Sequence, residues 1–466
     1  MNSKLTKNGY TIRKSEHSTS LIKEVKDELT VKPFSYNKNN KTDANRFCVF
    51  LESPKKLYLP RFYGYKKFGE PQIDKLNCGD DINITFNGDL RPEQVPIEKL
   101  YLNSAKEKGG GIISIKCGGG KTVLALHITS VLKKKTIVIV HKDFLMTQWR
   151  DRIKEFLPDA KIGKIQQDTI DIEDKDIVLA MVQSLSMKEY EEDTFTSFGL
   201  AIFDECHHLG AEVFSRSMGK VASKYMLGLS ATPKRKDGLS KVFEWYMGDI
   251  VYNQKKKNED YAEVQLIDCD FTDNDYCKVE LTYMKEPCMP RMINNICNFL
   301  PRTELIIDLI VKYHKEGRNV LILSDRRGHL DRLYELLSDY SRGFYVGGMK
   351  PNDLRDSQEK DILLATFSMA SEGMDIPKLD TVILASPKSD VEQSVGRVFR
   401  KKACDREFHP LIIDIQDNFS MFQNQCNKRL TLYKRMGFSI FHNGEQIPNR
   451  KPRKKKLKEF ALLDSD

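Results

Sequence analysis

Short apolar runs alternate with amphipathic segments through most of this 466-residue chain. The apolar runs are rich in β-branched residues and predict strands that are buried on both faces. In the first block, strands are predicted at 112–115, 136–140, 177–181, 200–203 and 226–229. Helical spacing of apolar residues after the first two strands predicts helices from 121 and over 144–156. This alternation is typical of a parallel sheet with helices on both faces, whose ligands bind beyond the carboxyl ends of the strands.

The same alternation returns after residue 300 and predicts a second parallel sheet of similar size. The helices expected there are 304–313 and 330–337, and the strands are 320–324, 361–366, 381–385 and 410–415. Residues 251–300 break the pattern around one predicted strand, 263–267, so we place a hinge near residue 250. The fold class is therefore α/β.

A smaller region precedes both blocks. The runs FCVFLE and KLYLPRF predict short strands, and basic and aromatic residues are interleaved over 61–68. Such a stretch can neutralise phosphates and offer stacking faces to bases. The alternative, which the pattern favours slightly, is a small β-rich module with aromatic core residues and solvated lysines.

Composition and charge narrow the class of protein. With 40% apolar and 30% charged residues, the chain has a globular composition. No run approaches the ~18 apolar residues of a membrane helix, and the N-terminus is too polar for a signal peptide, so we expect an intracellular protein. A location in the nucleus stays open. The ten cysteines are scattered without a C-x-x-C pair, which favours reduced thiols over a zinc site.

The net charge of +9 gathers at the two ends of the chain, and residues 450–458, RKPRKKKLK, contain seven lysines and arginines. A chain with a neutral middle and basic ends suggests that these ends bind a polyanion electrostatically. A solvated tail that binds nothing is the alternative.

The most informative stretch is GGGIISIKCGGGKT, residues 109–122. A buried strand enters a glycine turn whose backbone N–H groups can converge on phosphate, and the turn opens onto a helix N-terminus. Lys121 would reach the β and γ phosphates, and the Thr122 hydroxyl would complete a Mg²⁺ shell. The usual pattern has glycine where Ile115 stands, so a turn without ligand is the alternative for this segment alone. The predicted cradle comprises Ile115, Lys116, Cys117, Gly118, Gly119, Gly120, Lys121 and Thr122.

Adjacent carboxylates follow the strand at 200–203. Asp204 would hold Mg²⁺ through water while Glu205 polarises the attacking water; capping of the next helix is the alternative. His207 could link these carboxylates to Ser230 and Thr232 at the end of the next strand.

Two further patterns complete the candidate chemistry. Upstream of the cradle, Gln94, close to Arg91, could pair with the adenine edge. In the second block, Gln393, Arg397 and Arg400 are spaced four and three apart, which predicts one helical face. Arginines from a second domain that face a triphosphate act as arginine fingers; a basic surface turn is the alternative.

In this order, the motifs resemble those of superfamily 2 helicases over about residues 85–430. The resemblance rests on six elements: Arg91 to Gln94, CGGGKT, DECHH, SAT, ATFSMASEGMDIP and QSVGRVFR. It implies two tandem RecA-like domains that use ATP and Mg²⁺. The expected boundaries are an N-terminal domain at 1–85, RecA-like domains at 86–252 and 301–440, a connector at 253–300 and a basic tail at 441–466.

Within the superfamily, the chain is similar to the branch of XPB and the phage helicase UvsW, and most like helicases of nucleocytoplasmic large DNA viruses. Arg235, followed by lysine and aspartate, resembles the R-E-D element of XPB with lysine in place of glutamate. Gly373 and Asp375 match the motif that couples nucleic acid to nucleotide. The resemblance also implies a set of strand-gripping residues, which are His141, Lys142, Gln183, Ser184, Ser324, Arg326, Thr366 and Ser368.

The expected function is an ATP-dependent helicase or translocase, a monomer acting on duplex or branched DNA. RNA polymerase and other transcription or repair factors are candidate partners, and no membrane is involved. The alternatives are an RNA helicase, an ATP-gated clamp or transcript-release factor that does not unwind processively, and a small-molecule P-loop enzyme.

Overall fold

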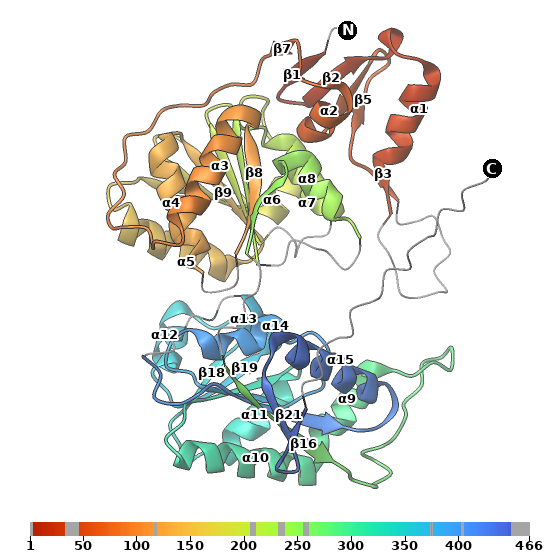
Figure 1. Cartoon of the computed structure of the whole chain (residues 1–466), viewed down its shortest axis with the longest axis vertical. Helices are drawn as coiled ribbons and strands as arrows, with labels where there is room; N and C mark the ends of the chain where they lie inside the picture. Colours follow the sequence, from red (N-terminus) through yellow and green to blue (C-terminus); the bar gives the residue numbers. More distant parts are fainter. Residues whose placement is uncertain are drawn as a thin grey trace, which may run out of the picture. The chain divides into compact units, whose positions relative to one another are not determined.

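The computed structural model describes residues 3–32, 46–115, 119–205, 211–231, 238–254, 261–372, 374, 376–401 and 405–448 (Figure 1). The chain divides into two compact units, residues 1–255 and 256–466. In the described part, no helix combines the length and apolar character needed to cross a membrane.

The large sheet of the first unit has the strand order β11-β10-β12-β9-β13-β14-β8-β15. Neighbouring strands pair in parallel, except for β10 with β11. The strands are β8 (Gly110–Ser114), β9 (Thr136–Val140), β10 (Ile162–Gln166), β11 (Thr169–Asp171), β12 (Ile177–Met181), β13 (Leu200–Asp204), β14 (Tyr225–Ser230) and β15 (Ile250–Asn253). The predicted parallel sheet is confirmed, and strands β8, β9 and β13 are buried along their whole length.

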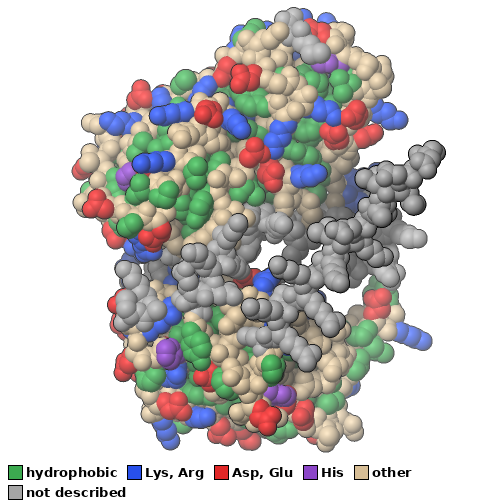
Figure 2. All heavy atoms as spheres, in the orientation of Figure 1, with side chains coloured by type: hydrophobic (Ala, Val, Ile, Leu, Met, Phe, Trp, Pro, Cys, Tyr) green, Lys and Arg blue, Asp and Glu red, His purple; other side chains and the backbone are tan. Residues whose placement is uncertain are grey.

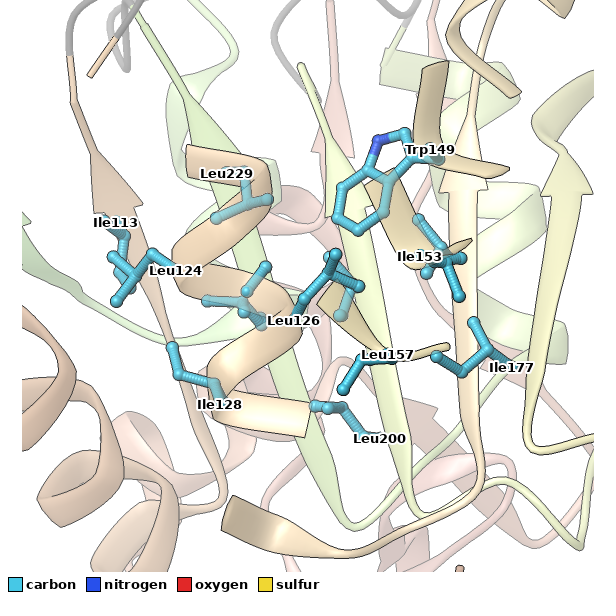
Figure 3. Close-up of a cluster of buried hydrophobic side chains, with 14 of the residues drawn as sticks. Ile113, Leu124, Leu126, Ile128, Trp149, Ile153, Leu157, Ile177, Leu200 and Leu229 are labelled. Carbon is cyan, nitrogen blue, oxygen red and sulfur yellow. The ribbon is translucent and has the colours of Figure 1, made fainter. Parts of the chain in front are cut away.

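Helices cover both faces of this sheet. They are α3 (Val95–Lys108), α4 (Lys121–Leu132), α5 (Asp143–Phe156), α6 (Val182–Met187), α7 (Ala211–Lys220) and α8 (Ser240–Met247). On one face, Leu126 of α4 and Ile153 of α5 pack over strand residues such as Leu229 (Figure 3). Met218 and Phe243 belong to the cluster on the other face. Each buried side chain of this size contributes about 1.5–3 kcal/mol, so the two layers hold the strand ends in fixed positions.

The end of α3 shows how sequence fixes a boundary. Pro96 lies in the first turn, where a missing N–H costs nothing, and Gly109 ends the helix with φ +89. A Cβ on Gly109 would lie 2.0 Å from an Arg61 guanidinium nitrogen. The chain can therefore turn directly from α3 into β8.

A small sheet of order β5-β6-β2-β1-β7 forms the N-terminal part of the first unit. Its elements are β1 (Lys4–Thr6), β2 (Gly9–Arg13), η1 (Lys14–Glu16), α1 (Thr19–Glu28), β5 (Leu51–Glu52), β6 (Lys56–Leu59), α2 (Arg61–Phe68) and β7 (Ile73–Asp74), beside the pair β3 (Thr30–Val31) and β4 (Phe47–Cys48). The prediction that KLYLPRF is all strand is wrong at its end, because Pro60 stops β6 and precedes α2.

The basic and aromatic stretch 61–68 packs within the first unit. Phe62 and Tyr63 are buried. Arg61 lies against the Phe62 ring and donates to the Lys224 carbonyl at 2.8 Å. Lys67 pairs with acids of α1. These contacts favour the interpretation with core aromatics over direct contact with nucleic acid.

The second unit holds a sheet of order β18-β19-β17-β20-β21-β16-β22-β23, parallel except for β22 with β23. Its strands are β16 (Glu263–Cys269), β17 (Val320–Ser324), β18 (Arg342–Tyr345), β19 (Ile362–Thr366), β20 (Thr381–Leu384), β21 (Leu411–Asp417), β22 (Ser439–His442) and β23 (Glu445–Ile447). Because β16 lies between β21 and β22, this segment is an interior strand of the second sheet, where the sequence predicted a connector.

The helices of the second unit surround this sheet (Figure 1). They are α9 (Met289–Asn298), α10 (Leu300–Lys315), α11 (Arg327–Leu336), α12 (Pro351–Gln358), α13 (Phe367–Glu372), α14 (Glu392–Val395), η4 (Gly396–Phe399) and α15 (Ser420–Met436). On the face drawn in Figure 2, described basic and acidic side chains are interspersed over both units. The basic tail from 450 onward lies outside the described residues.

Candidate nucleotide-binding site

Three of the predicted motifs meet at one edge of the first unit's large sheet. Strands β8, β14 and β13 are neighbours, and the register pairs Ser114 with Ser230 and Leu229 with Asp204. Their carboxyl ends therefore lie side by side, with Lys121 at the start of α4. This is the edge at which parallel sheets bind ligands.

Lys121 and Glu205 form an ion pair at this edge. The distance from Lys121 Nζ to Glu205 Oε1 is 2.7 Å, and the two side chains are 11% and 12% exposed. The other carboxylate oxygen, Oε2, accepts a hydrogen bond from the backbone N–H of Ala231 at 3.3 Å. Glu205 thus connects the predicted cradle with the end of β14.

The backbone of Glu205 has φ +46, in the left-handed region. For a residue with a Cβ this conformation costs about 1–2 kcal/mol. Such strain concentrates at functional sites, where surrounding contacts hold the unfavourable conformation in place. Here those contacts are the ion pair with Lys121 and the hydrogen bond from Ala231.

Asp204 is buried beside this pair, and its Oδ2 accepts a hydrogen bond from Trp149 Nε1 at 2.8 Å. Burial, and then the charge of Glu205, raises the pKa of Asp204 to about 6; Lys121 and the Trp149 hydrogen bond act in the opposite direction. A buried carboxylate next to a second one favours a cation nearby, because opposite charge stabilises its ionised form.

The N-terminus of α4 is built to receive an anion. Its N-cap residue, Gly120, has no side chain with which to cap the helix, and its first turn contains no acid. Helix N-termini of this kind attract negative charge through their N–H groups and dipole. Gly120 has φ +75, and a Cβ there would lie 2.5 Å from Gln94 Nε2. Three cradle residues, Lys116, Cys117 and Gly118, lie outside the described residues.

Gln94 supports the glycine turn directly. Its Nε2 donates to the carbonyls of Gly119 and Gly120 at 3.3 and 3.1 Å, and its Oε1 accepts from the N–H of Arg91 at 3.0 Å. The nitrogen and the oxygen of the buried amide therefore both have hydrogen-bond partners within the chain, whereas the sequence predicted that this side chain pairs with adenine. Contact between Arg91 or Gln94 and an adenine base stays a prediction.

These features fit a magnesium-bound triphosphate. The N-terminus of α4 and Lys121 suit phosphate oxygens, and the buried carboxylate of Asp204 suits a cation. Thr122 lies in the first turn of α4 and is partly exposed, so its hydroxyl can serve the same cation. The described residues thus offer donors for both ATP and Mg²⁺.

Sequence reasoning missed Trp149, whose only signal was its place on the buried face of α5. We expect Trp149→Phe to keep an aromatic ring but lose the donor that orients Asp204. Loss of a partner that orients a metal ligand typically lowers metal affinity or activity 10–100-fold. The kcat for ATP hydrolysis should therefore fall about tenfold or more. A higher Mg²⁺ concentration should also be needed to reach the half-maximal rate. ATPase titrations with Mg²⁺ test this. Trp245→Phe, in the same unit against Tyr63, is the matched control; equal Mg²⁺ dependence in both variants would refute the role.

The structure brings together the four residues of the first unit that the family pattern assigns to strand gripping. His141 and Lys142 follow β9, and Gln183 and Ser184 lie in the first turn of α6, after the neighbouring strand β12. Gln183 Nε2 donates to the His141 carbonyl at 2.9 Å. Ser184 is buried and its hydroxyl accepts from the N–H of Gln167, while Gln183 is exposed. Their contact with nucleic acid stays a prediction.

In the second unit the corresponding residues lie at or just after the ends of the neighbouring strands β17 and β19, where Ser324 pairs with Thr366. The Ser324 hydroxyl is fully buried, lies 3.2 Å from His329 Nδ1 and accepts from the N–H of Arg326. Arg326 itself donates to the carbonyl of Pro290. The hydroxyl of Thr366 accepts from the backbone N–H of Met369, and Ser368 is exposed. Ser324 therefore shapes this loop from inside the unit.

The three residues expected on one helical face are separated by a change of helix type. The α-helix α14 ends at Val395 and continues as the tighter 3-10 helix η4, which alters the angle between successive side chains. Arg397 is buried, and its guanidinium donates to the carbonyls of Ala370, Ser371 and Met374. Gln393 and Arg400 are partly exposed. Arg400 Nη2 donates to the same Met374 carbonyl at 3.4 Å, so Arg397 and Arg400 share a side of this turn although only Arg397 is buried.

The coupling residues are described only in part. Ser230 is buried, and its carbonyl accepts from the N–H of Ile115 at 3.0 Å, which ties β14 to the cradle. A described link from β14 to Glu205 is the hydrogen bond from the backbone N–H of Ala231. The link predicted through His207 is not tested. His207, Thr232, Arg235, Gly373 and Asp375 lie outside the described residues.

Two protein-family models match the chain. The model described as "Type III restriction enzyme, res subunit" covers residues 87–235. The model described as "Helicase conserved C-terminal domain" covers residues 301–402. Each match falls within one of the two units.

Relatives of known name are similar over most of the chain. The Acanthamoeba polyphaga mimivirus protein named "Putative ATP-dependent RNA helicase L396" is 36% identical over 453 residues, 94% of this chain and 86% of the relative. An African swine fever virus protein of the same description is 25% identical over 75% of this chain and 73% of its own length. The crystal structure of T4 UvsW aligns with 95% of this chain and 99% of its own at 19% identity and a TM-score of 0.41. The match to the mimivirus relative, together with the two family models, shows that this chain belongs to the superfamily 2 helicases, enzymes that hydrolyse ATP.

Proposed function

We propose that this chain couples ATP hydrolysis to movement along, or remodelling of, duplex or branched DNA. The observation that carries the proposal is the cluster of Lys121, Glu205 and Asp204 at the N-terminus of α4, whose N-cap residue is Gly120. A cation, a carboxylate next to it and a second, buried carboxylate are the groups that phosphoryl transfer to water requires. A turn that binds nothing would not need a buried Asp204 beside Glu205.

In the proposed mechanism, Lys121 exchanges its partner. Its Nζ lies 2.7 Å from Glu205 in this structure, and phosphate oxygens of ATP would compete with that carboxylate for the ammonium. Glu205, released from the pair, would then take the proton of the attacking water. When bound, Mg²⁺ would neutralise charge on the phosphate oxygens, with Asp204 and Thr122 as its protein donors.

We assign the two arginines of QSVGRVFR different parts in this mechanism. Arg397, with its guanidinium on three backbone carbonyls, holds the turn that follows α14. Arg400 is partly exposed and lies at the end of the same turn. Arg400 is therefore the better candidate for the arginine finger, and Arg397 the residue that shapes the turn around it.

The choice of DNA rests on the resemblance of the motifs to the branch that contains XPB and UvsW. The second candidate is an RNA helicase, because the mimivirus and African swine fever virus relatives are named as ATP-dependent RNA helicases. Both candidates use the same ATP site, so the polynucleotide that stimulates hydrolysis distinguishes them.

ATPase activity with duplex DNA, branched DNA, single-stranded DNA and duplex RNA tests the proposal. We expect duplex or branched DNA to stimulate most, with an apparent affinity that falls steeply with salt because phosphate contacts release counterions. Stimulation by RNA alone would favour the RNA helicase. Hydrolysis that no polynucleotide stimulates would contradict both candidates. Lys121→Ala is the control and should abolish hydrolysis in every arm.

A further inference from the structure

The segment that leads from β20 toward Arg400 is held on both sides by buried ion pairs. We call residues 385–388 (Ala385, Ser386, Pro387 and Lys388) the β20 exit segment. It begins after Leu384, the last residue of β20, and ends four residues before α14 begins at Glu392. Arg400 follows after α14 and η4.

The first pair joins Arg302 of α10 to Asp417 of β21. Arg302 donates through Nε to Oδ1 at 2.8 Å and through Nη2 to Oδ2 at 3.0 Å, and the two side chains are 1% and 2% exposed. Its remaining nitrogen, Nη1, donates to the carbonyl of Ala385 at 2.7 Å. The Tyr276 hydroxyl donates to Asp417 at 2.6 Å. One guanidinium thus spans a buried carboxylate and the first residue of the exit segment.

The second pair repeats this arrangement with Arg429 of α15 and Asp414 of β21. Arg429 Nε donates to both Asp414 oxygens at 2.9 Å, and Nη1 donates to the carbonyl of Lys388 at 2.8 Å. The Tyr433 hydroxyl donates to Asp414 at 2.8 Å. Because Asp414 and Asp417 are three residues apart on one strand, they point to opposite faces of the sheet. The exit segment is therefore held from both faces.

A third set of contacts holds the middle of the exit segment. The N–H of Asp325 donates to the Ser386 hydroxyl at 2.9 Å, and Asp325 Oδ2 pairs with Lys388 Nζ at 2.8 Å. Downstream, Arg397 anchors the turn itself on the carbonyls of Ala370 and Met374. Both the entry to the turn and the turn are thus fixed within the second unit.

We propose that Arg302 and Arg429 are positioning residues that set where Arg400 points, by clamping the β20 exit segment. The inference rests on the proposed role of Arg400 in ATP hydrolysis. Buried ion pairs seldom stabilise a fold more than apolar residues of equal volume would, so stability alone is a weak reason for two of them. A guanidinium that stabilises a transition state must be held within about 0.5 Å of its productive position. Clamping the segment that leads to Arg400 would serve that requirement.

The same sheet offers a matched control. Arg318 pairs with Asp380 at 3.4 Å and donates to the His409 carbonyl at 3.0 Å, and the two paired side chains are 15% and 13% exposed. Asp380 directly precedes β20, at the opposite end of the strand from the exit segment. Arg318→Lys therefore disturbs a comparable pair without touching the residues that lead to Arg400.

The experiment compares Arg302→Lys, Arg429→Lys and Arg318→Lys in the full chain, by kcat and KM for ATP and by Tm. Lysine keeps the charge but loses the planar fork that spans carboxylate and carbonyl. We expect kcat to fall about tenfold or more in the first two variants with KM within about twofold, while Arg318→Lys keeps its kcat at a similar Tm. Equal kcat in all three variants, or losses that follow Tm alone, would overturn the clamp. If a clamp variant fails to fold, Arg302→Met with Asp417→Leu replaces the pair by apolar residues and is measured in its place.

A double-mutant cycle separates this inference from the proposed function. If the clamp acts through Arg400, adding Arg302→Lys to Arg400→Ala should lower kcat by no more than about twofold further. If the losses in kcat of the two single variants multiply in the double variant, Arg302 acts independently of Arg400, which would refute the clamp. Wild-type turnover in Arg400→Ala alone would instead refute the proposed arginine finger. Lost turnover in Arg400→Ala with normal kcat in the clamp variants would refute the clamp only.

Discussion

Glu205→Gln is expected to bind ATP at least as tightly as the unchanged chain and to hydrolyse it roughly 10²–10⁴-fold more slowly, the usual worth of a general base. Glutamine has the same shape and can still accept the hydrogen bond from Ala231, so the local fold should persist. Glutamine lacks the negative charge that pairs with Lys121, so the phosphate oxygens of ATP have no carboxylate competing for the Lys121 ammonium. Nucleotide binding by titration and hydrolysis by phosphate release measure the two effects separately.

The matched control for this variant is Glu98→Gln. Glu98 is a buried acid in the same unit, and its carboxylate lies 2.6 Å from His127 Nδ1 on α4. Its replacement should leave kcat nearly unchanged. Turnover of Glu205→Gln equal to that of Glu98→Gln would remove Glu205 from the chemistry.

Arg400→Ala is expected to lower kcat about 10³-fold or more, with a modest change in KM, because an arginine finger acts mainly on the transition state. Arg400→Lys should restore little of this, since a point charge does not reproduce the guanidinium fork. Single-turnover hydrolysis at saturating ATP measures the chemical step. Arg355→Ala, an exposed arginine on α12 of the same unit, is the control. A large rise in KM with kcat retained would show that Arg400 serves only ground-state binding.

The parts of the fold that sequence predicted well are the continuous apolar strands. Thr136–Val140 and Val320–Ser324 have the predicted bounds, because every residue is buried and polar neighbours mark both ends. Strand β10, Ile162–Gln166, was missed because only alternate residues are buried and lysine occupies its middle. Strand β16 was placed in a connector because charged runs flank it, although its pairing partners lie far away along the chain.

The residues of the candidate site also include some that the sequence could predict and some that it could not. Lys121, Asp204 and Glu205 could be predicted, because each stands at a local transition from strand to turn or turn to helix. The hydrogen bond from Trp149 to Asp204 spans 55 residues, and no periodicity reveals such a pairing. The burial of Arg397 escaped prediction because it depends on the switch from α14 to η4 at Gly396. The buried pairs of Arg302 and Arg429 likewise join residues that only the folded sheet brings together.

We propose that Lys121 and Glu205 of the first unit and Arg400 of the second act on the same triphosphate. The most direct measurement is an experimental structure of the full chain with ADP, aluminium fluoride and Mg²⁺, which mimics the transferring phosphoryl group. We expect Lys121 Nζ and the Arg400 guanidinium both to lie within about 3.2 Å of the fluoride or phosphate oxygens. A complex in which Lys121 contacts the analogue while Arg400 stays out of hydrogen-bonding range would contradict it.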